Sequence, residues 1–332
     1  MYCKSKANVS RCISIARKQE KKKMTFDVII VGAGMSGTFM SSMLREKRKN
    51  VLILEKSSGI GGRMSTKPIG SQIVDYGCQY IKPKTDISVH LASKLENLGL
   101  LSEIALDANK RVFIAPFGMN KIPQYFSRNT RVLSNTLVKS ISHKKTGWEV
   151  FTDVGSFSSL SVVLTMPIAQ IETIFRKSGV ENFNLPKVDY LDFHTCTFTS
   201  DKHGIDDVFS KNETFPWICN NSKKGLRNTK DAFTVNVNKG ITQTIKNLSP
   251  EQKLEIVEEL LNKSGFANIK GLNVHYWRYA FADYQDNPDY FFDKSTGLGI
   301  CGDSFSIGKV DGAVKSAELL FSKLCNYLDN NF

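Results

Sequence analysis

The sequence predicts an α/β protein in two parts, one built on a parallel sheet with a small β-meander and the other an α+β part built on an antiparallel sheet. Near the start, four β-forming residues from Val28 to Val31 lead into a glycine-rich turn and then a segment typical of a helix. Between positions 186 and 245, aromatic and β-branched residues alternate, which is typical of strands in a separate sheet. The length of 332 residues is enough for two such parts.

The glycine-rich turn has the spacing of a dinucleotide-binding motif. Its glycines at 32, 34 and 37 follow the G-x-G-x-x-G pattern. The first allows a tight turn, the second lets the backbone approach a pyrophosphate, and the third lets the next helix pack closely on the strand. We expect that helix over 38–45 and a second buried strand over 51–54, ending at Glu55, a carboxylate placed to bind a ribose. The pattern predicts a Rossmann-type dinucleotide site.

A second glycine-rich segment follows the acidic residue. It contains Gly61, Gly62 and Arg63, and the guanidinium is able to reach a pyrophosphate oxygen. An NAD dehydrogenase does not need this second loop. The segment therefore favours a longer dinucleotide such as FAD.

The other elements are predicted from periodicity and from capping residues. Ser249, Pro250 and Gln252 form a helix start with a capping box, and Gly265 ends that helix. The other expected helices cover 91–100, 170–178 and 310–327. The expected extended segments are 72–81 with a turn at Gly77, 111–115, 131–135, 136–142, 147–153, 157–160, 161–166 and 297–303.

The positive charge is concentrated at the start of the chain. Residues 1–23 contain eight Lys or Arg and one Glu, and so carry +7 of the formal charge of +13. Such a segment suits an arm for nucleic acid or acidic lipid, a transit peptide, or a disordered extension ahead of a start at Met24. We expect the extension, because Met24 directly precedes the first strand, and we expect no nucleic-acid partner. No apolar run reaches the ~20 residues of a membrane helix.

The cysteines and histidines argue against disulfide and metal frameworks. The seven cysteines are scattered with no C-x-x-C pair, and the five histidines show no metal-ligand spacing. We expect a reducing, cytoplasmic compartment and no metal. We also expect Cys78 and Cys301, which lie beside motif residues, to be buried rather than reactive, and His275 to pack or to hydrogen-bond to the backbone rather than to act as a catalyst.

Four blocks together resemble the flavin amine-oxidase superfamily and, within it, the renalase-type proteins. These blocks are 31–37, 61–66, 75–81, and 301–305 with 310–313. The similarity runs from Met24 to about position 327 and implies a noncovalently bound FAD. It implies an FAD-binding domain made of 24–85, 131–170 and 296–332, and a substrate domain made of 86–130 and 171–295.

The resemblance also implies which residues hold FAD. The glycine loop and Arg63 would lie along the pyrophosphate, Glu55 at the adenosine ribose, Val138 at the adenine and Asp303 at the ribityl or phosphate part. The helix beginning near Val310 would point N–H groups at the flavin N1/O2 edge, where reduced flavin carries negative charge. The implied set is Gly32, Gly34, Met35, Ser36, Gly37, Glu55, Lys56, Gly62, Arg63, Met64, Val138, Gly302, Asp303, Val310, Asp311 and Ala313.

One position departs from the amine oxidases. These enzymes usually have a Tyr three residues before the Gly of their C-terminal x-x-Gly-Ala segment, where it forms part of an aromatic cage for a neutral amine. Lys309 stands at that position here. A cation would repel a protonated amine and remove the stacking wall, so it favours an anionic or polar substrate.

The renalase-type resemblance implies that 2- or 6-dihydro-NAD(P) gives a hydride to FAD and that O2 reoxidises the flavin, forming hydrogen peroxide. Hydride transfer needs stacked rings rather than an acid or base, so no catalytic side chain is assigned. The alternatives are an amine oxidase or related flavin desaturase, and a protein that binds FAD as a scaffold or sensor. The candidate pocket residues are Tyr80, Trp217, Trp277, Arg278 and Lys309. The candidate cations for substrate phosphates, which surface or core roles would equally explain, are Lys223, Lys224, Arg227 and Arg278.

Overall fold

The computed structural model describes residues 25–107, 110–180, 185–226, 228–283 and 287–331. The basic segment 1–23 and Arg227 lie outside the described residues. The described strands are β1 (Thr25–Val31), β2 (Val51–Leu54), β3 (Thr66–Ile69), β4 (Gln72–Asp75), β5 (Ser102–Asp107), β6 (Lys110–Ile114), β7 (Arg131–Leu133), β8 (Val138–Lys144), β9 (Gly147–Thr152), β10 (Ser156–Leu164), β11 (Tyr190–Thr199), β12 (Phe209–Ser210), β13 (Trp217–Asn220), β14 (Ala232–Asn236), β15 (Lys270–Ala282), β16 (Phe291–Asp293) and β17 (Leu298–Ile300). The described helices are α2 (Met35–Glu46), α3 (Asp86–Asn97), α4 (Lys121–Ser127), α5 (Ile168–Ser178), α6 (Lys239–Ile245), α7 (Pro250–Lys263) and α8 (Lys309–Asn330).

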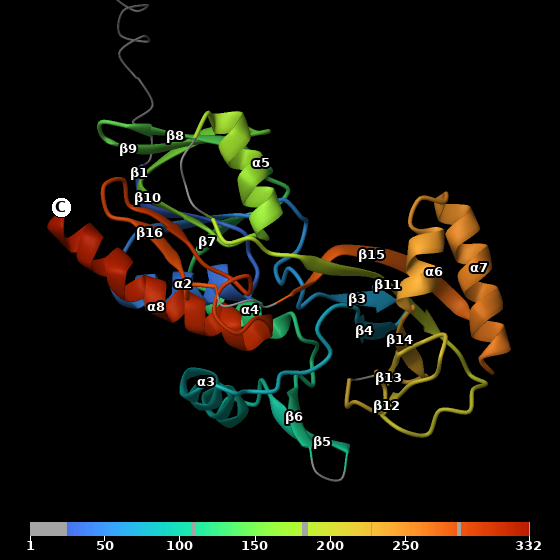
Figure 1. The fold of residues 1–332 in the computed structure, drawn as a ribbon. Helices are drawn as coiled ribbons and strands as arrows, with labels where there is room; N and C mark the ends of the chain where they lie inside the picture. Colours follow the sequence, from blue (N-terminus) through green and yellow to red (C-terminus); the bar gives the residue numbers. More distant parts are fainter. Residues whose placement is uncertain (1–24, 108–109, 181–184, 227, 284–286, 332) are drawn as a thin grey trace, which may run out of the picture.

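The first sheet brings the two ends of the chain together. Its order is β16-β17-β10-β1-β2-β7, and β8 and β9 continue from β10 as an antiparallel meander. Strand β1 pairs in parallel with β10 and β2, and β10 pairs in parallel with β17. Helices α2 and α8 lie on one face and α5 on the other (Figure 1). This is the mixed α/β architecture with a small meander that the sequence predicts.

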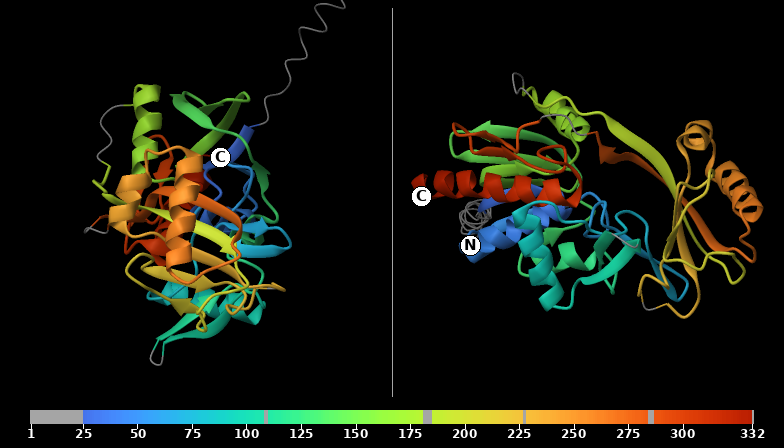
Figure 2. Two further views of the ribbon diagram at one scale, coloured as in Figure 1. Left: turned by 90° about the vertical axis from the view of Figure 1, so that its right-hand side faces the viewer. Right: turned by 60° about the horizontal axis from the view of Figure 1, so that its bottom comes forward.

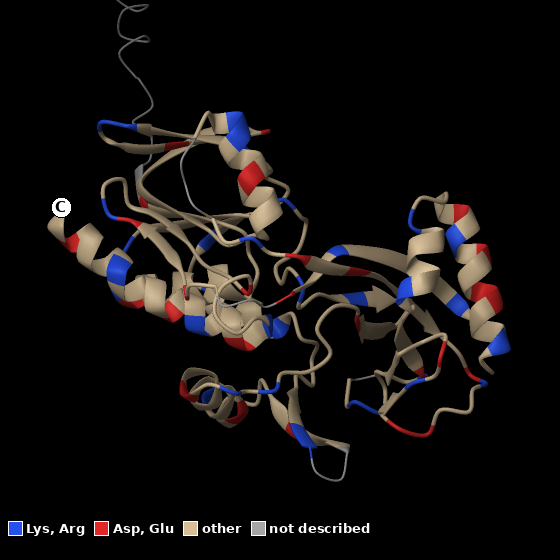
Figure 3. Cartoon of the chain, viewed as in Figure 1, with Lys and Arg blue, Asp and Glu red and all other residues tan. Residues whose placement is uncertain are grey.

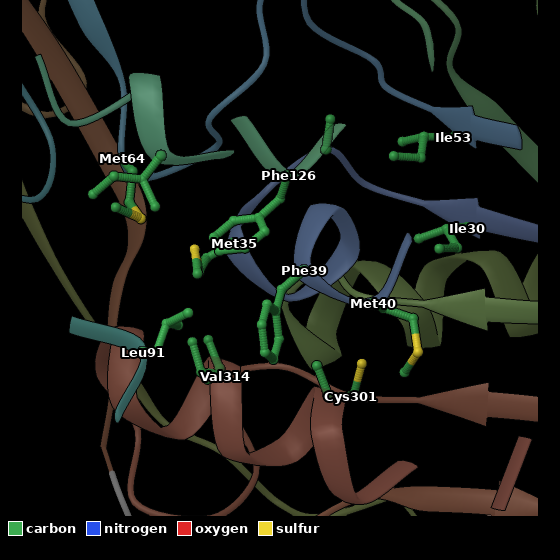
Figure 4. Packing of buried hydrophobic residues seen from close by; sticks show 14 of the residues in the cluster. Ile30, Met35, Phe39, Met40, Ile53, Met64, Leu91, Phe126, Cys301 and Val314 are labelled. Atoms are coloured by element: carbon green, nitrogen blue, oxygen red, sulfur yellow. The ribbon is translucent and has the colours of Figure 1, made fainter. Parts of the chain in front are cut away.

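Alternating side chains of β1 enter two different cores, as expected for a strand covered on both faces. Val28 and Ile30 join the core formed with α2, α4 and α8, whereas Ile29 and Val31 join the core beneath α5. In the first core the ring of Phe39 meets that of Phe126 edge to face at 5.2 Å. Figure 4 shows the Phe39 ring close to Val314 of α8. The packing fixes the helix that follows the glycine turn.

The second sheet is antiparallel, with the order β12-β13-β14-β11-β15. Helices α6 and α7 contribute to its core on one face, and the β3–β4 hairpin packs near β14. The long strands β11 and β15 run from the region of the first sheet into the second (Figure 2). The alternating pattern over 186–245 predicts this sheet, but it does not include the longest strand, β15, which covers 13 residues.

Most predicted boundaries shift by a few residues, and two larger differences have a clear structural cause. The runs 157–160 and 161–166 form one strand, β10, which pairs with β9 in its first half and with β1 over most of its length. The helix expected at 91–100 begins at Asp86, because Thr85 caps it and Ser88 completes the capping box. The capping box at Ser249 and Gln252 is confirmed. Among the described residues, no helix is long and apolar enough to span a membrane.

Candidate functional site

The glycine turn leaves open space at the start of α2. Gly32 has φ +108°, a conformation that favours glycine, and a Cβ on Gly37 would lie 2.1 Å from the Gly32 carbonyl oxygen. A Cβ on Gly34 would meet nothing within 4 Å. Gly32 and Gly37 are therefore required by the turn itself, whereas Gly34 borders a space that a ligand can fill.

Glu55 fixes the end of β2 against this turn. Its Oε2 accepts a hydrogen bond from the Ala33 N–H at 2.8 Å, and its Oε1 accepts one from the Ser57 N–H, also at 2.8 Å. The residue is 7% exposed and lines the cavity described below. Each carboxylate oxygen accepts more than one hydrogen bond, so Glu55 retains capacity for ribose hydroxyls.

The second glycine loop contacts the first and connects it to the C-terminal segment. A Cβ on Gly62 would lie 3.2 Å from the Gly34 Cα. Arg63 pairs with Asp303 through its two terminal guanidinium nitrogens: Nη1 donates to Oδ2 at 2.6 Å, and Nη2 donates to Oδ1. Burial opposes the charge on Arg63, but Asp303 outweighs this effect and raises the pKa of the guanidinium. The sequence predicts a separate cofactor contact for each residue, and the structure joins them in one ion pair.

The start of α8 presents a strained turn and a carboxylate. Lys309 has φ +57° and Gly308 has φ +72°, and the Lys309 ammonium lies 6.0 Å from the centre of the Phe281 ring. Asp311 Oδ1 accepts a hydrogen bond from the Thr85 hydroxyl at 2.9 Å, and its Oδ2 is buried without a partner among the described residues. A non-glycine residue in this left-handed region is strained and is often found at a ligand site.

These segments enclose one large cavity of about 1550 Å³. Its volume exceeds the ~300–1,000 Å³ of a pocket for one small ligand. Of the sixteen residues that the family resemblance assigns to FAD, fourteen line the cavity, and Gly37 and Gly302 do not. All five candidate pocket residues line it as well, namely Tyr80, Trp217, Trp277, Arg278 and Lys309. The elements that carry these residues come from both ends and the middle of the chain.

Unpaired polar atoms in the lining fit an extended ligand with hydroxyl and amide groups. Asn120 Oδ1 and Asp311 Oδ2 are buried acceptors without a partner among the described residues, and Trp217 Nε1 is a buried donor in the same situation. A buried group without a partner costs about 1–3 kcal/mol. Together with the open space at Gly34, these atoms fit FAD, whose ribityl and ribose hydroxyls donate and whose ring carbonyls accept.

The cavity is lined by a strong excess of positive charge. Ten Lys or Arg residues line it, against four Asp or Glu residues. Hydrogen bonds engage all four carboxylates, from backbone N–H groups (Glu55), Arg63 (Asp303), Thr85 (Asp311) and Tyr276 (Asp192). By contrast, both signs are mixed along the outer helix α7 (Figure 3). A cavity of this kind attracts an anionic ligand.

Two groups of rings lie at the part of the cavity formed by the second sheet, and all of their members except Phe209 line it. The Tyr76 and Trp277 rings stack at 5.4 Å, and His275 meets Trp277 edge to face at 4.4 Å. Trp217 lies 4.8 Å from Phe209 and 5.7 Å from Tyr80. His275 packs against the rings of Tyr76 and Trp277, and it also lines the cavity.

Two of the candidate cations for substrate phosphates are wrongly predicted. Lys224 is fully buried, with its ammonium 2.6 Å from Asp75 Oδ2, and it does not line the cavity. Burial opposes the charge, but Asp75 raises the pKa of Lys224. Lys223 donates to the Asp206 carbonyl and also lies outside the lining. Arg278 is the described member of that set that faces the cavity.

Of the two cysteines beside the motifs, Cys301 is buried, as predicted, whereas Cys78 is only partly buried and lines the cavity. Burial raises the pKa of Cys78 to about 11 and also raises the pKa of Cys301. Thiols with raised pKa values are poor nucleophiles at neutral pH. Within the described residues, no group of three or more His, Cys, Asp or Glu is arranged to hold a metal ion.

Several residues that line the cavity are not predicted from the sequence. Lys67, on β3, lies 4.7 Å from the centre of the Tyr76 ring, and burial lowers its pKa to about 8. Asn120 and Tyr76 also line the cavity. Tyr76 lies within the 75–81 block, whereas Lys67 and Asn120 belong to no motif.

Comparisons with known proteins agree on the nucleotide-binding segment and on the fold. Residues 30–95 match a domain family described as NAD(P)-binding Rossmann-like domain. The chain is 36% identical over 81 residues to amine oxidase [flavin-containing] A of Equus caballus, covering 23% of this chain and 15% of that enzyme. It is 29% identical over 92 residues to putrescine oxidase of Kocuria rosea, covering 28% and 19%. The chain thus matches less than a fifth of the length of either relative.

The structural likeness covers far more of the chain. Cyclohexylamine oxidase from Brevibacterium oxydans superposes with a TM-score of 0.68 over 92% of this chain and 100% of that one, at 14% identity. Wild-type putrescine oxidase bound to putrescine superposes with a TM-score of 0.61 over 91% and 99%, at 13% identity. At such identities the likeness shows the fold alone.

Proposed function

We propose that this chain, which has the fold of the flavin-containing amine oxidase superfamily, is an oxidoreductase that binds FAD noncovalently and oxidises 2- or 6-dihydro-NAD(P) to NAD(P)+, with O2 as acceptor. The observation that carries the proposal is the single cavity lined by fourteen of the sixteen expected FAD residues. When bound, FAD would supply the hydride acceptor and pass electrons to O2, forming hydrogen peroxide. We also propose the two-domain division and cytoplasmic location expected from the sequence.

Three groups of residues would hold the cofactor. The open space at Gly34 and the start of α2 would receive the pyrophosphate, since free N–H groups at a helix start bind anions. Glu55 would bind the ribose hydroxyls. The start of α8, with Val310 and Ala313 in the lining, would point N–H groups at the flavin N1/O2 edge. The Arg63–Asp303 pair would keep these groups in position.

The charge of the cavity supports an anionic second ligand. The volume of about 1550 Å³ exceeds the ~300–1,000 Å³ of a pocket for one small ligand, which leaves room for a second ligand beside FAD. Lys309 and Arg278 line the same cavity and would attract the phosphates of a dinucleotide and repel a protonated amine. The raised pKa values of Cys78 and Cys301 support noncovalent binding, because a thiol tether to flavin requires a reactive sulfur.

The test is anaerobic stopped-flow absorbance at about 450 nm, where oxidised flavin absorbs. We expect 2- and 6-dihydro-NAD(P) to bleach the flavin quickly and ordinary NADH to bleach it slowly. Readmission of O2 should restore the colour and produce one equivalent of hydrogen peroxide per donor oxidised. Equal rates with all isomers, or no bleaching, would contradict the proposal.

An amine oxidase is the second candidate, because the sequence relatives and the superposed structures are named as amine oxidases. Against it stands Lys309 at the position where these enzymes usually have a cage tyrosine. The same anaerobic experiment with putrescine, benzylamine and cyclohexylamine separates the two. Bleaching by an amine and by no dihydronicotinamide would establish the second candidate.

A further inference from the structure

The indole N–H of Trp217 differs from those of the other two tryptophans. Trp148 Nε1 donates to the Thr296 carbonyl at 2.8 Å, and Trp277 Nε1 donates to the Tyr76 carbonyl at 3.1 Å. Trp217 Nε1 is buried and has no partner among the described residues, although its ring lines the cavity. A ligand acceptor would remove the cost of this unpaired donor.

Trp217 belongs to a row of polar side chains that crosses the second sheet. Asn236 of β14 lies opposite Trp217 of β13 and also opposite Thr195 of β11, and Thr195 in turn lies opposite His275 of β15. Directly opposed residues of antiparallel strands project from the same face, with Cβ atoms about 4.5–5.5 Å apart. Trp217, Asn236 and His275 line the cavity. The row therefore forms part of the cavity wall.

A hydrogen bond inside the row orients the amide of Asn236. The Thr195 hydroxyl donates to Asn236 Oδ1 at 2.9 Å, and Thr195 is 1% exposed. With its oxygen engaged, the amide presents its NH2 group as a donor. The row thus offers two donors, the Trp217 N–H and the Asn236 NH2, beside the rings of Tyr80 and Phe209.

We infer that this row, Trp217, Asn236, Thr195 and His275, recognises the carbonyl oxygen of a carboxamide or carboxylate carried by a flat conjugated ring. The inference rests on the proposed function in one respect, that a second planar ligand shares the cavity with the cofactor. In the proposed reaction this oxygen belongs to the carboxamide of the dihydronicotinamide ring. The rings of Trp217 and Tyr80 supply an apolar surface in the cavity lining, and the two N–H donors determine which edge of the ligand ring faces the sheet. Thr195 is a positioning residue that acts through Asn236.

The test measures binding by calorimetry on protein saturated with FAD, with benzamide, benzoate and toluene as probes. We expect benzamide to bind more tightly than toluene. Trp217→Phe keeps an aromatic ring and removes the N–H, so it should weaken benzamide about five- to tenfold, the effect of one neutral hydrogen bond, and leave toluene unchanged. Asn236→Asp should weaken benzoate more than benzamide, because it replaces a donor with a negative charge. Thr195→Val should weaken the binding of benzamide, because it removes the hydroxyl that orients Asn236. Thr195→Ser keeps the hydroxyl and should bind benzamide as wild type does.

Trp148→Phe is the matched control, because Trp148 lies outside the cavity lining. It should lower thermal stability and leave all three affinities unchanged. Equal binding of benzamide and toluene, or unchanged benzamide affinity in Trp217→Phe, would overturn the inference. If Trp217→Phe weakens benzamide although no dihydronicotinamide bleaches the flavin, the proposed reaction fails and the recognition site stands. If dihydronicotinamides bleach the flavin but Trp217→Phe leaves the benzamide affinity unchanged, the proposed reaction stands and the recognition site fails.

Discussion

Arg63 and Asp303 lie 240 positions apart in the chain and form a forked ion pair in the structure. The same guanidinium donates weakly to the carbonyl groups of Tyr279 and Ala280 at the end of β15. Arg63 therefore joins the second glycine loop, the strand of the second sheet and the segment before α8. These three segments form part of the cavity wall. The ion pair therefore holds the segments that give the cavity its shape.

Arg63→Lys should weaken this connection while keeping the positive charge. A lysine ammonium cannot form the paired geometry of a guanidinium, so we expect a loss of about 1.5–3 kcal/mol in the free energy of unfolding. FAD affinity should also fall roughly tenfold. Chemical denaturation and FAD titration measure the two effects. Arg111→Lys is the control, because Arg111 pairs with Glu103 at 3.4 Å and both are exposed. If both variants behave alike, the pair has no special role.

Alanine at two glycines of the first loop should separate ligand binding from folding. Gly34→Ala places a methyl group in open space at the cavity. It should leave the thermal midpoint within a few degrees of wild type and weaken FAD at least tenfold, because the methyl group occupies the approach of the pyrophosphate. Gly37→Ala places a methyl group 2.1 Å from the Gly32 carbonyl oxygen, so the apoprotein itself should be strongly destabilised. Undiminished FAD affinity in a folded Gly34→Ala protein would contradict this assignment.

Lys224→Met should destabilise the protein strongly, because it leaves the Asp75 carboxylate buried without its cation. Both side chains have zero exposure, and breaking such a pair costs about 3–5 kcal/mol. Urea denaturation measures the loss. The exposed pair of Lys263 and Glu259 provides the control, and Lys263→Met should change the free energy of unfolding by less than about 0.5 kcal/mol. A similar small change in both variants would refute the structural role of Lys224.

The burial of Lys67 should make the stability of the protein depend on pH. Burial lowers its pKa to about 8 from 10.5, so the folded protein releases this proton at a lower pH than the unfolded chain does. Below pH 8 both states are charged and the burial penalty is fully present, and above pH 10.5 both are neutral and it is absent.

The free energy of unfolding of wild type, measured relative to Lys67→Met, should therefore rise between pH 8 and 10.5. The rise should be about 1 kcal/mol, because solvent screens the half-exposed amine. Denaturation of both proteins at several pH values measures this difference. A difference that stays constant, or that falls with pH, would contradict the environment assigned to Lys67.

The sequence predicts those features that depend on neighbouring residues. The glycine spacing predicts the β1–α2 turn, and Ser249 with Gln252 predicts the start of α7. The start of α3 is missed because Ser88, rather than Glu or Gln, completes the capping box of Thr85. The strand β10 is divided in the prediction because its start pairs with β9 and is partly exposed, whereas its end pairs with β17 and is fully buried, so the hydrophobic pattern changes along it.

Features that depend on distant residues are not accessible in this way. Lys224 has the composition of a surface cation, and only the approach of Asp75, 149 positions earlier, explains its burial. The row from Trp217 to His275 likewise depends on the register of four strands, which periodicity does not determine. Cavity residues outside the motifs, such as Lys67 and Asn120, come from the same kind of long-range packing.

The central claim, that both ends of the chain enclose one noncovalently bound FAD, is tested most directly by titrating the purified protein with FAD. The account predicts a yellow protein that binds one FAD per chain and releases all of it, unmodified, into solution on denaturation. Protein that stays colourless under gentle conditions and takes up no added FAD would contradict the account. Flavin that remains attached to the denatured chain would contradict the noncovalent assignment.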